Sequence, residues 1–237
     1  MINIQNESSL HNTLKLYYAT KFKGKIEVES EKYIYDIVCP KNHIIEIQTQ
    51  NLSSLYKKIE YILDHKNTLT LVHPVVIKKT IYNYDSDNVL ISKSTSSKKG
   101  HYLDIFSELT KIYPFLLHKK FTLKVLEINM IEERLNLLQK TQSKNKRRRY
   151  KKNWQKTNKR LENLICEHTI KTKDDYKALL PPLPTLFSSK ELRLALEENN
   201  VPSRIYNNCT IILWVLVRMG LIEKVKTENR YRYYKFV

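Results

Sequence analysis

The sequence predicts an α/β fold in which helices flank a β-sheet, followed by a compact helical module that ends in a hairpin. Three observations support this prediction. Short alternating stretches rich in β-branched residues occur at 25–29, 33–38 and 43–49, as expected for strands. A nearly continuous apolar run at 68–77 has the composition of a strand that is buried on both faces. The segment 174–237 changes to helical periodicity.

The composition limits the classes of protein to which the chain can belong. Its 237 residues, 41% of them hydrophobic, are enough for one large or two small cores. Lys and Arg number 42 against 24 Asp and Glu, and this formal net charge of +18 favours a polyanionic partner such as nucleic acid. Isolated glycines exclude a glycine-rich phosphate loop, and three widely spaced cysteines indicate reduced thiols. Neither a signal peptide nor a membrane span is expected, so the predicted location is the cytoplasm.

The first part of the chain is predicted to alternate between helix and strand. A helix is expected over 7–20, with an apolar face made of Leu10, Leu14, Leu16 and Tyr17. After the three-strand meander, the segment 52–65 places its apolar residues on one helical face, with Lys57, Lys58 and Glu60 largely opposite. A polar loop is expected at 85–100, and a helix and a further strand are expected at 102–113 and 121–130.

Two of the predicted strands carry an acid where an apolar residue is expected. Glu46 and Gln48 point to one face of their strand, and Asp36 meets them there if the strands pair. Two carboxylates within about 4 Å of each other repel by roughly 4 kcal/mol at an effective dielectric near 20, so the arrangement favours a divalent cation between them. The pattern therefore predicts a nuclease-like metal site. The alternative is that Asp36 is a strand-end cap and Gln48 an exposed strand residue.

The order helix, three-strand meander, helix, strand, with Asp36 on the second strand and Glu46 two residues before Gln48, resembles the PD-(D/E)XK restriction-endonuclease-like superfamily. The resemblance covers roughly residues 7–80 and implies a mixed-sheet core. It also implies that Asp36 and Glu46 bind Mg²⁺, with Mn²⁺ as a substitute, and that Gln48 helps to position the attacking water. The sequence departs from the family pattern in having Gln48 where Lys is usual and no Pro before Asp36. Glu7, in the first turn of the helix, either complements the helix dipole or adds a carboxylate to the site.

A strongly basic segment follows the predicted sheet. Helical periodicity begins at 131–138, and residues 140–160 then contain eleven Lys and Arg and no acid. This segment is predicted to be a basic linker that grips nucleic acid, with Tyr150 and Trp154 stacking on bases or sugars; a merely solvated linker is the alternative. The candidate phosphate contacts, with those of the loop 85–100, are Lys93, Lys98, Lys99, Lys146, Arg147, Arg148, Arg149, Lys151 and Lys152.

The last segment is predicted to contain helices, including a long one over 204–220, and a terminal hairpin. Ser188 is the expected cap of one helix, with Glu191 in its first turn. The order resembles the winged-helix DNA-binding fold over residues 174–237, and Trp214 is expected in its core. The resemblance implies DNA contacts by Ser203, Arg204, Tyr206, Asn207 and Asn208 on the helix, and by Lys226, Arg230 and Arg232 on the wing. Docking of a protein partner is the alternative use of such a module.

The sequence thus predicts an endonuclease-like domain at 1–138, a basic linker at 139–173 and a winged-helix domain at 174–237. The predicted function is a divalent-metal-dependent endonuclease that hydrolyses phosphodiester bonds in double-stranded DNA. The alternatives are a catalytically inactive DNA-binding regulator on the same scaffold and an RNA-processing nuclease, since basic charge and tyrosines do not separate RNA from DNA. Many endonucleases of this type pair to cut both strands, so a homodimer is compatible with the resemblance.

Overall fold

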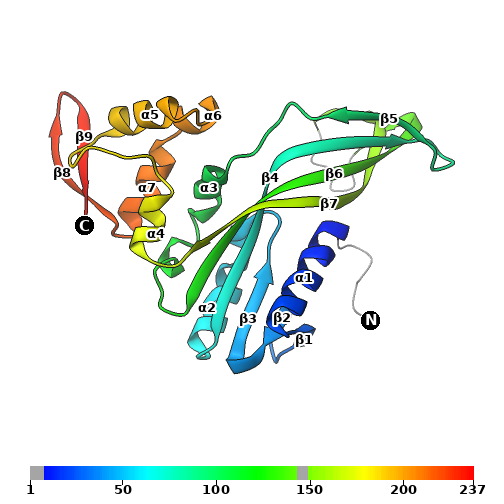
Figure 1. The fold of residues 1–237 in the computed structure, drawn as a ribbon, viewed down its shortest axis with the longest axis horizontal. Coiled ribbons are helices and arrows are strands. Elements are labelled where there is room, and N and C mark those ends of the chain that lie inside the picture. Colours follow the sequence, from blue (N-terminus) through cyan, green and yellow to red (C-terminus); the bar gives the residue numbers. More distant parts are fainter. Residues whose placement is uncertain (1–7, 143–148) are drawn as a thin grey trace.

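A seven-stranded mixed sheet forms the centre of the molecule (Figure 1). The computed structural model describes residues 8–142 and 149–237. The strand order is β1-β2-β3-β4-β6-β7, with β5 paired to the distal half of β4; β3, β4 and β6 run parallel and the other pairs are antiparallel. The predicted α/β class, with helices flanking a sheet, is confirmed. The strands are β1 (Lys25–Glu29), β2 (Ile34–Cys39), β3 (His43–Ile47), β4 (Thr68–Tyr84), β5 (Leu90–Thr95), β6 (Phe121–Thr141) and β7 (Lys152–Ile170).

Helices cover both faces of the sheet. On one face, α1 (Ser9–Phe22) buries Leu10, Leu14 and Tyr18 against apolar residues of β2, β3, β4 and β6. On the other face lie α2 (Tyr56–Asp64), α3 (Ile105–Leu109) and the C-terminal module, which share one hydrophobic core with the sheet. The helix at the N-terminus is therefore confirmed, but its apolar face is rotated from the predicted one, because Leu16 and Tyr17 are exposed while Tyr18 is buried.

Strand β4 is buried on both faces over its first half, as its apolar composition predicts. It contains Pro74, which has no N–H to give to a neighbouring strand. The pairing of β4 with β3 ends at Val72, and its pairing with β5 begins at Thr80. Pro74 therefore lies where neither β3 nor β5 pairs with β4, and a proline is tolerated in an otherwise central strand.

Residues 131–141 and 152–170 are strand rather than helix or irregular linker, so both predictions were wrong for these residues. Strand β6 continues through residues 131–138, and β7 pairs with it antiparallel along most of its length. Residues 131–137 are buried or half-buried without a strict alternation, so their pairing with β4 and β7, rather than a local pattern, makes them a strand. The distal parts of β4, β6 and β7, together with β5, project beyond the helices as an extended arm (Figure 1). Strand β5 likewise replaces part of the loop predicted at 85–100.

The C-terminal module contains α4 (Lys173–Ala178), α5 (Ser189–Glu198), α6 (Ser203–Tyr206), α7 (Thr210–Arg218) and the hairpin of β8 (Ile222–Glu228) and β9 (Tyr231–Phe236). The capping box of Ser188 and Glu191 is confirmed. The long helix predicted at 204–220 is broken into α6 and α7. Trp214 was wrongly expected to be buried, since it is 41% exposed on α7.

The module is packed firmly on the sheet. Arg204 at α6 donates to the carboxylate of Asp104 at 2.6 Å and to the carbonyl of Lys99 at 2.9 Å. The hydroxyl of Tyr102 donates to the carbonyl of Leu179 at 3.1 Å. The buried core also runs without interruption from α2 and α3 into α7. In the described parts of the chain, no helix has the length and apolarity needed to cross a bilayer.

Gly24, directly after α1, provides a test of this packing. A Cβ at this position would lie 2.4 Å from Cγ2 of Ile37 and 2.9 Å from Sγ of Cys39. We expect Gly24→Ala to lower the free energy of unfolding by about 1–3 kcal/mol, because α1 must move away from β2. Lys25→Ala, at the neighbouring exposed position, should change it by no more than about 0.5 kcal/mol. Chemical denaturation measures both, and equal effects would contradict the close approach.

Candidate active site

Asp36 lies on β2 at the point where regular pairing with both neighbouring strands lapses. The β2–β3 register ends at Ile37 and Ile45. Beyond it, the backbone N–H of Ile47 donates to Oδ2 of Asp36 at 2.7 Å, so a side chain replaces a ladder hydrogen bond. On the other side, Glu27 of β1 has a φ of 54°, a left-handed conformation that is uncommon outside glycine, and the β1–β2 register skips it.

Glu46 lies on β3 and is almost completely buried, with 4% of its surface exposed. Its Oε2 accepts a hydrogen bond from Nζ of Lys58 at 2.6 Å, and its Oε1 accepts one from the backbone N–H of Asp36 at 3.3 Å. The ammonium group of Lys58, which comes from α2, also donates to the carbonyl of Ile34 at 2.7 Å. These bonds hold the ammonium group of Lys58 and the two carboxylates at the place where β2 and β3 separate.

A histidine from the opposite face of the sheet completes the group. Nε2 of His11, on α1, lies 2.8 Å from the carbonyl oxygen of Ile47 and 3.4 Å from Oδ2 of Asp36. Since α1 and α2 cover opposite faces, His11 and Lys58 approach the two acids from opposite sides of the sheet. The end of the β2–β3 ladder is therefore the place where both helices meet the acids.

The two acids differ in their affinity for protons. Burial, reinforced by the nearby charge of Asp36, raises the pKa of Glu46 to about 7, and the charge and hydrogen bond of Lys58 only partly offset this. Burial acts in the same direction on Asp36, but hydrogen bonds from His11 and the Ile47 N–H, with the charge of Lys58, lower its pKa below the ordinary value. Asp36 is therefore the more acidic of the two, and Glu46 holds its proton more tightly than an ordinary carboxyl.

The arrangement is chemically suited to a hard divalent cation. Mg²⁺ prefers carboxylate oxygens and keeps several waters, so one or two protein carboxylates are enough to hold it. A divalent charge near Glu46 would favour the ionised form of a carboxyl whose pKa is raised in its absence. Asp36 and Glu46, the predicted metal ligands, therefore lie at one place and are residues that could hold such an ion.

Gln48 is not brought against the acids. Its side-chain amide donates to the carbonyl of Gln50 at 2.6 Å, to the carbonyl of Asn51 at 3.3 Å and to the hydroxyl of Ser54 at 3.2 Å. These bonds hold it in the turn after β3. In the described part of the chain, Lys58 is the residue whose ammonium group contacts Glu46, and Gln48 makes no hydrogen bond to either acid.

Sequence reasoning missed Lys58 and His11. Lys58 was assigned to the polar face of its helix, yet that face borders the end of β2, where a long side chain can reach a buried carboxylate. His11 follows Glu7 by four residues, so the proposed direction of Glu7 toward the site was a usable signal for His11 as well. Glu7 itself lies outside the described residues.

The basic residues predicted to contact nucleic acid divide into exposed and internally paired groups. Lys93 on β5 lies over the ring of Tyr82, 4.8 Å from its centroid, and remains exposed. Arg149, Lys151 and Lys152 are exposed at the tip of the arm, whereas Lys146, Arg147 and Arg148 lie outside the described residues. Arg204 is half-buried and is paired within the chain, because its guanidinium donates to Asp104 and to the carbonyl of Lys99.

Cross-strand acids neutralise part of the charge of β7. Lys156 lies 2.9 Å from Glu132, and Arg160 lies 2.7 Å from Glu133. Glu132 is buried, and despite that burial its hydrogen bonds with Lys156 and Arg134 and the charge of Lys79 lower its pKa to about 2. A partner within the chain therefore explains some of the charges that the sequence assigned to an external anion.

Lys159 is not neutralised in this way. It lines a cavity of about 320 Å³, between β4, β6, β7 and the segment before α3, whose lysines are Lys79, Lys98, Lys156 and Lys159. Burial, with repulsion by Lys156 and Lys79, lowers the pKa of Lys159. Among the described residues, no carboxylate lies within ion-pair distance of its Nζ. His73 lies at one end of this cavity, and its Nδ1 is 2.7 Å from the carbonyl oxygen of Gln48 at the end of β3.

The C-terminal candidates occupy two environments. Asn208 donates to the carbonyl of Arg204 at 2.8 Å, and Lys226 is paired with Glu228 on the exposed hairpin. A cleft of about 880 Å³ lies between α7 and the hairpin. Its lining includes Arg218, Lys224, Arg230, Arg232 and the exposed Trp214, while Asn207 is exposed between α6 and α7.

The raised pKa of Glu46 gives a test that needs no ligand. A carboxyl with an ordinary pKa of 4.5 and a folded-state pKa of about 7 binds more protons when folded, so its contribution to stability is present below pH 4.5 and is lost as the pH rises through 7. In metal-free buffer, Glu46→Gln should remove this loss, which corresponds to about 3 kcal/mol at 1.36 kcal/mol per pH unit. Denaturation of both proteins across pH 4–8 measures it. Glu60→Gln, an exposed change on α2, should keep the slope of the original protein, and a parallel pH profile for Glu46→Gln would refute the assignment.

Comparison of the sequence with known proteins shows the family of the chain. A protein of Treponema pallidum (strain Nichols), described as an uncharacterized protein, is 28% identical over 191 residues, which cover 81% of this chain and 73% of the relative. No solved structure matches the chain. A family model described as a domain of unknown function (DUF8091) matches residues 8–171, which run from the cap of α1 to the end of β7. The chain belongs to this DUF8091 family.

Proposed function

We propose that the protein is a Mg²⁺-dependent endonuclease acting on DNA, with Mn²⁺ as an alternative cation. The observation that carries the proposal is the convergence of Asp36, Glu46 and Lys58 where β2 and β3 separate. Two carboxylates and a lysine are the groups that phosphodiester hydrolysis needs for cation binding and charge stabilisation. The basic composition of the chain, at +18, supports a polyanionic substrate.

Each residue has a distinct task in this proposal. Asp36 stays ionised through its hydrogen bonds and, together with Glu46, would hold the cation. A bound divalent ion would supply Lewis-acid stabilisation of the charge that develops on the phosphate. Lys58, whose ammonium group contacts Glu46 at 2.6 Å, would donate to a phosphate oxygen or orient the attacking water. Lys58 thus fills the role that the resemblance assigned to position 48.

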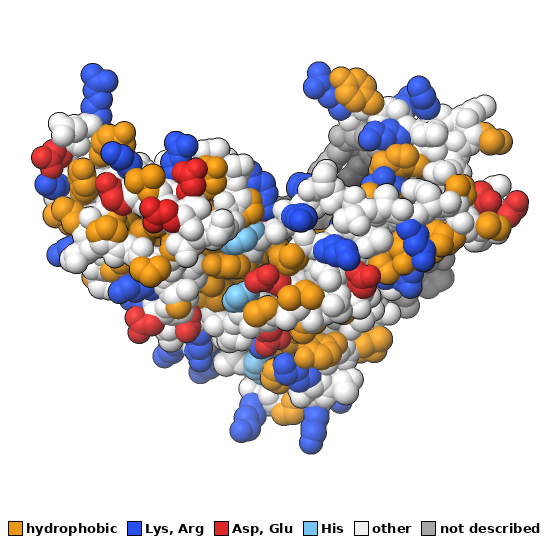
Figure 2. Space-filling view, turned by 45° about the horizontal axis from the view of Figure 1, so that its top comes forward, with side chains coloured by type: hydrophobic (Ala, Val, Ile, Leu, Met, Phe, Trp, Pro, Cys, Tyr) orange, Lys and Arg blue, Asp and Glu red, His pale blue; other side chains and the backbone are white. Residues whose placement is uncertain are grey.

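A hollow on the surface supplies the place for a duplex in this proposal. Figure 2 shows it between the C-terminal module and the arm, with Lys and Arg side chains on its floor and on the side of the arm. The cavity between the arm and the segment before α3 is lined by four lysines and three acids, and the ammonium group of Lys159, which has no ion-pair partner among the described residues, is its candidate contact for a phosphate. The C-terminal module has the order of helices followed by a hairpin, and a backbone bridge joins Phe187 to Tyr234 of the hairpin. Both features support the proposal that this module is a winged helix.

A second function, DNA binding without catalysis, has its own support. Gln48 is held in a turn, and both acids already have partners within the chain, His11 for Asp36 and Lys58 for Glu46. A scaffold that no longer binds a metal would gain from such internal pairing. Cleavage of DNA in the presence of Mg²⁺ or Mn²⁺ separates the two functions.

The proposal predicts metal-dependent cleavage that fails in variants of the site. Purified protein with Mg²⁺ or Mn²⁺ should cut duplex DNA, and Asp36→Asn or Glu46→Gln should slow cutting at least about a hundredfold, since a bound metal supplies several kcal/mol of transition-state stabilisation. Lys58→Met should slow it by about the same factor. Single-turnover rates on duplex, branched and single-stranded DNA and on RNA provide the measurement.

Matched controls make the result decisive. Glu60→Gln and Lys57→Met change exposed residues of α2 beside the site, and both should cut at the original rate. Equal cutting by Glu46→Gln and the original protein would overturn the proposal. Tight DNA binding without cleavage of any substrate would establish the second function, and cleavage confined to RNA would establish an RNA-processing nuclease.

DNA binding should also depend on Lys159 more than on its neighbour. Lys159 has unpaired charge in the cavity, whereas Arg160 is paired with Glu133. Lys159→Gln should make the log-log dependence of affinity on salt shallower by about 0.9, the value of one phosphate contact. Arg160→Gln should change it much less. Titration of a short random-sequence duplex in Ca²⁺ at several salt concentrations tests this, and equal slopes for the two variants would contradict the role of the cavity.

A further inference from the structure

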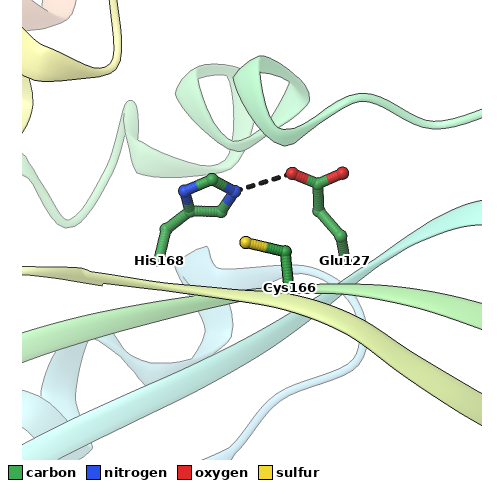
Figure 3. Close-up of side chains that lie close together, drawn as sticks. All are labelled: Glu127, Cys166 and His168. Atoms are coloured by element: carbon green, nitrogen blue, oxygen red, sulfur yellow. Dashed lines mark hydrogen bonds and ion pairs between the residues drawn. The ribbon is translucent and has the colours of Figure 1, made fainter.

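A second group of side chains of metal-binding types lies where β6 pairs with β7. In the strand order, β4 separates this group from Asp36 on β2 and Glu46 on β3. Glu127 on β6 is the register partner of Cys166 on β7, and His168 follows two residues later on β7. Since side chains alternate along a strand, Cys166 and His168 share one face, and Glu127 meets them there. Figure 3 shows the three side chains converging above the two strands.

The geometry of this group is close to that of a coordination site. One ligand atom from each residue lies within 4.8 Å of the other two. Nε2 of His168 is 2.6 Å from Oε1 of Glu127, and the sulfur of Cys166 lies beside this pair. A histidine–carboxylate pair accounts for two of the residues. It does not account for a thiol aimed at the same point.

The surroundings leave the group open to an ion. Cys166 is the exposed one of the three cysteines, whereas Cys39 and Cys209 are buried. The ring of Tyr102 packs against His168, with 5.0 Å between ring centroids, and limits its rotation. His101 is nearby, but its Nδ1 accepts the N–H of Leu103, so its other nitrogen carries the proton and is not a ligand in this arrangement.

We propose that Glu127, Cys166 and His168 bind a zinc-class divalent ion. A thiolate and an imidazole select borderline-soft metals such as Zn²⁺, in contrast to the oxygen-only pair of Asp36 and Glu46. Three protein ligands leave a fourth tetrahedral position for water or a ligand from a partner. On binding, the thiol of Cys166 gives its proton to solvent, and the imidazole proton now shared with Glu127 moves to Nδ1, so that sulfur and Nε2 both present lone pairs.

Such an ion would connect β6 with β7 close to the anchor of the C-terminal module, because Tyr102 contacts both His168 and the carbonyl of Leu179. An ion that binds only the folded protein stabilises it in proportion to the logarithm of its concentration above the dissociation constant. Zn²⁺ should therefore raise the melting temperature of the protein.

Cobalt is the probe that reports the ligands directly. The intact protein, reduced and then freed of metal, should take up one Co²⁺ or Zn²⁺ and show a thiolate-to-cobalt charge-transfer band. Cys166→Ser should abolish the band, and His168→Gln and Glu127→Gln should each weaken Zn²⁺ binding, by at least about tenfold for the imidazole. Glu162→Gln, an exposed acid on the same strand, should bind Zn²⁺ normally. Calorimetry measures the affinities, and circular dichroism verifies that each variant is folded.

The outcomes separate this site from the proposed active site. Glu46→Gln should retain the cobalt band, and Cys166→Ser should retain Mg²⁺-dependent cleavage if the protein is a nuclease. A band that persists in Cys166→Ser, or stoichiometric Zn²⁺ binding unaffected by all three substitutions, would overturn the proposal. Absence of Co²⁺ and Zn²⁺ binding by the original protein would do the same.

Discussion

The separation of β2 from β3 leaves backbone N–H groups without ladder partners, and the side chains of Asp36 and Glu46 accept them. A buried N–H without a partner costs about 1–3 kcal/mol, so these acids are part of the sheet as much as of the site. Their burial in turn requires positive charge, which Lys58 supplies from α2 and His11 complements from α1. The same side chains thus serve the pairing of the strands, the contacts of the helices and the chemistry of the site. A loss of function in a variant of either acid must therefore be compared with the stability of that variant.

The positive charge of β7 also depends on partners within the chain. Two acids on β6, Glu132 and Glu133, neutralise Lys156 and Arg160 of β7. Charges without such partners remain in the cavity around Lys159 and at the tip of the arm. The net charge of +18 therefore overstates the charge that is free for an external anion, although some Lys and Arg side chains lie on the surfaces of the hollow seen in Figure 2.

The order of elements up to β4 was predictable because each has a clear local signal, such as the alternation of β2 and β3 or the apolar run of β4. The acids Asp36 and Glu46 were predictable for the same reason, as charges in apolar strands. Lys58 was not, because its role depends on where α2 crosses the end of β2, which is a tertiary fact. The arm was not predicted either. Its strands are so polar that their pairing, rather than any local preference, defines them, and the charge of residues 140–160 favoured an unstructured interpretation.

The continuous core of the molecule has a consequence for the family itself. The family model ends at residue 171, yet α3 and the segment after it pack on α7, and Tyr113 stacks edge-on against Trp214. The matched region, residues 8–171, is therefore not a closed hydrophobic unit in this protein. Removal of the C-terminal part would expose the apolar face that α7 covers here, so the region 8–171 of this protein depends on residues outside the match to close its core.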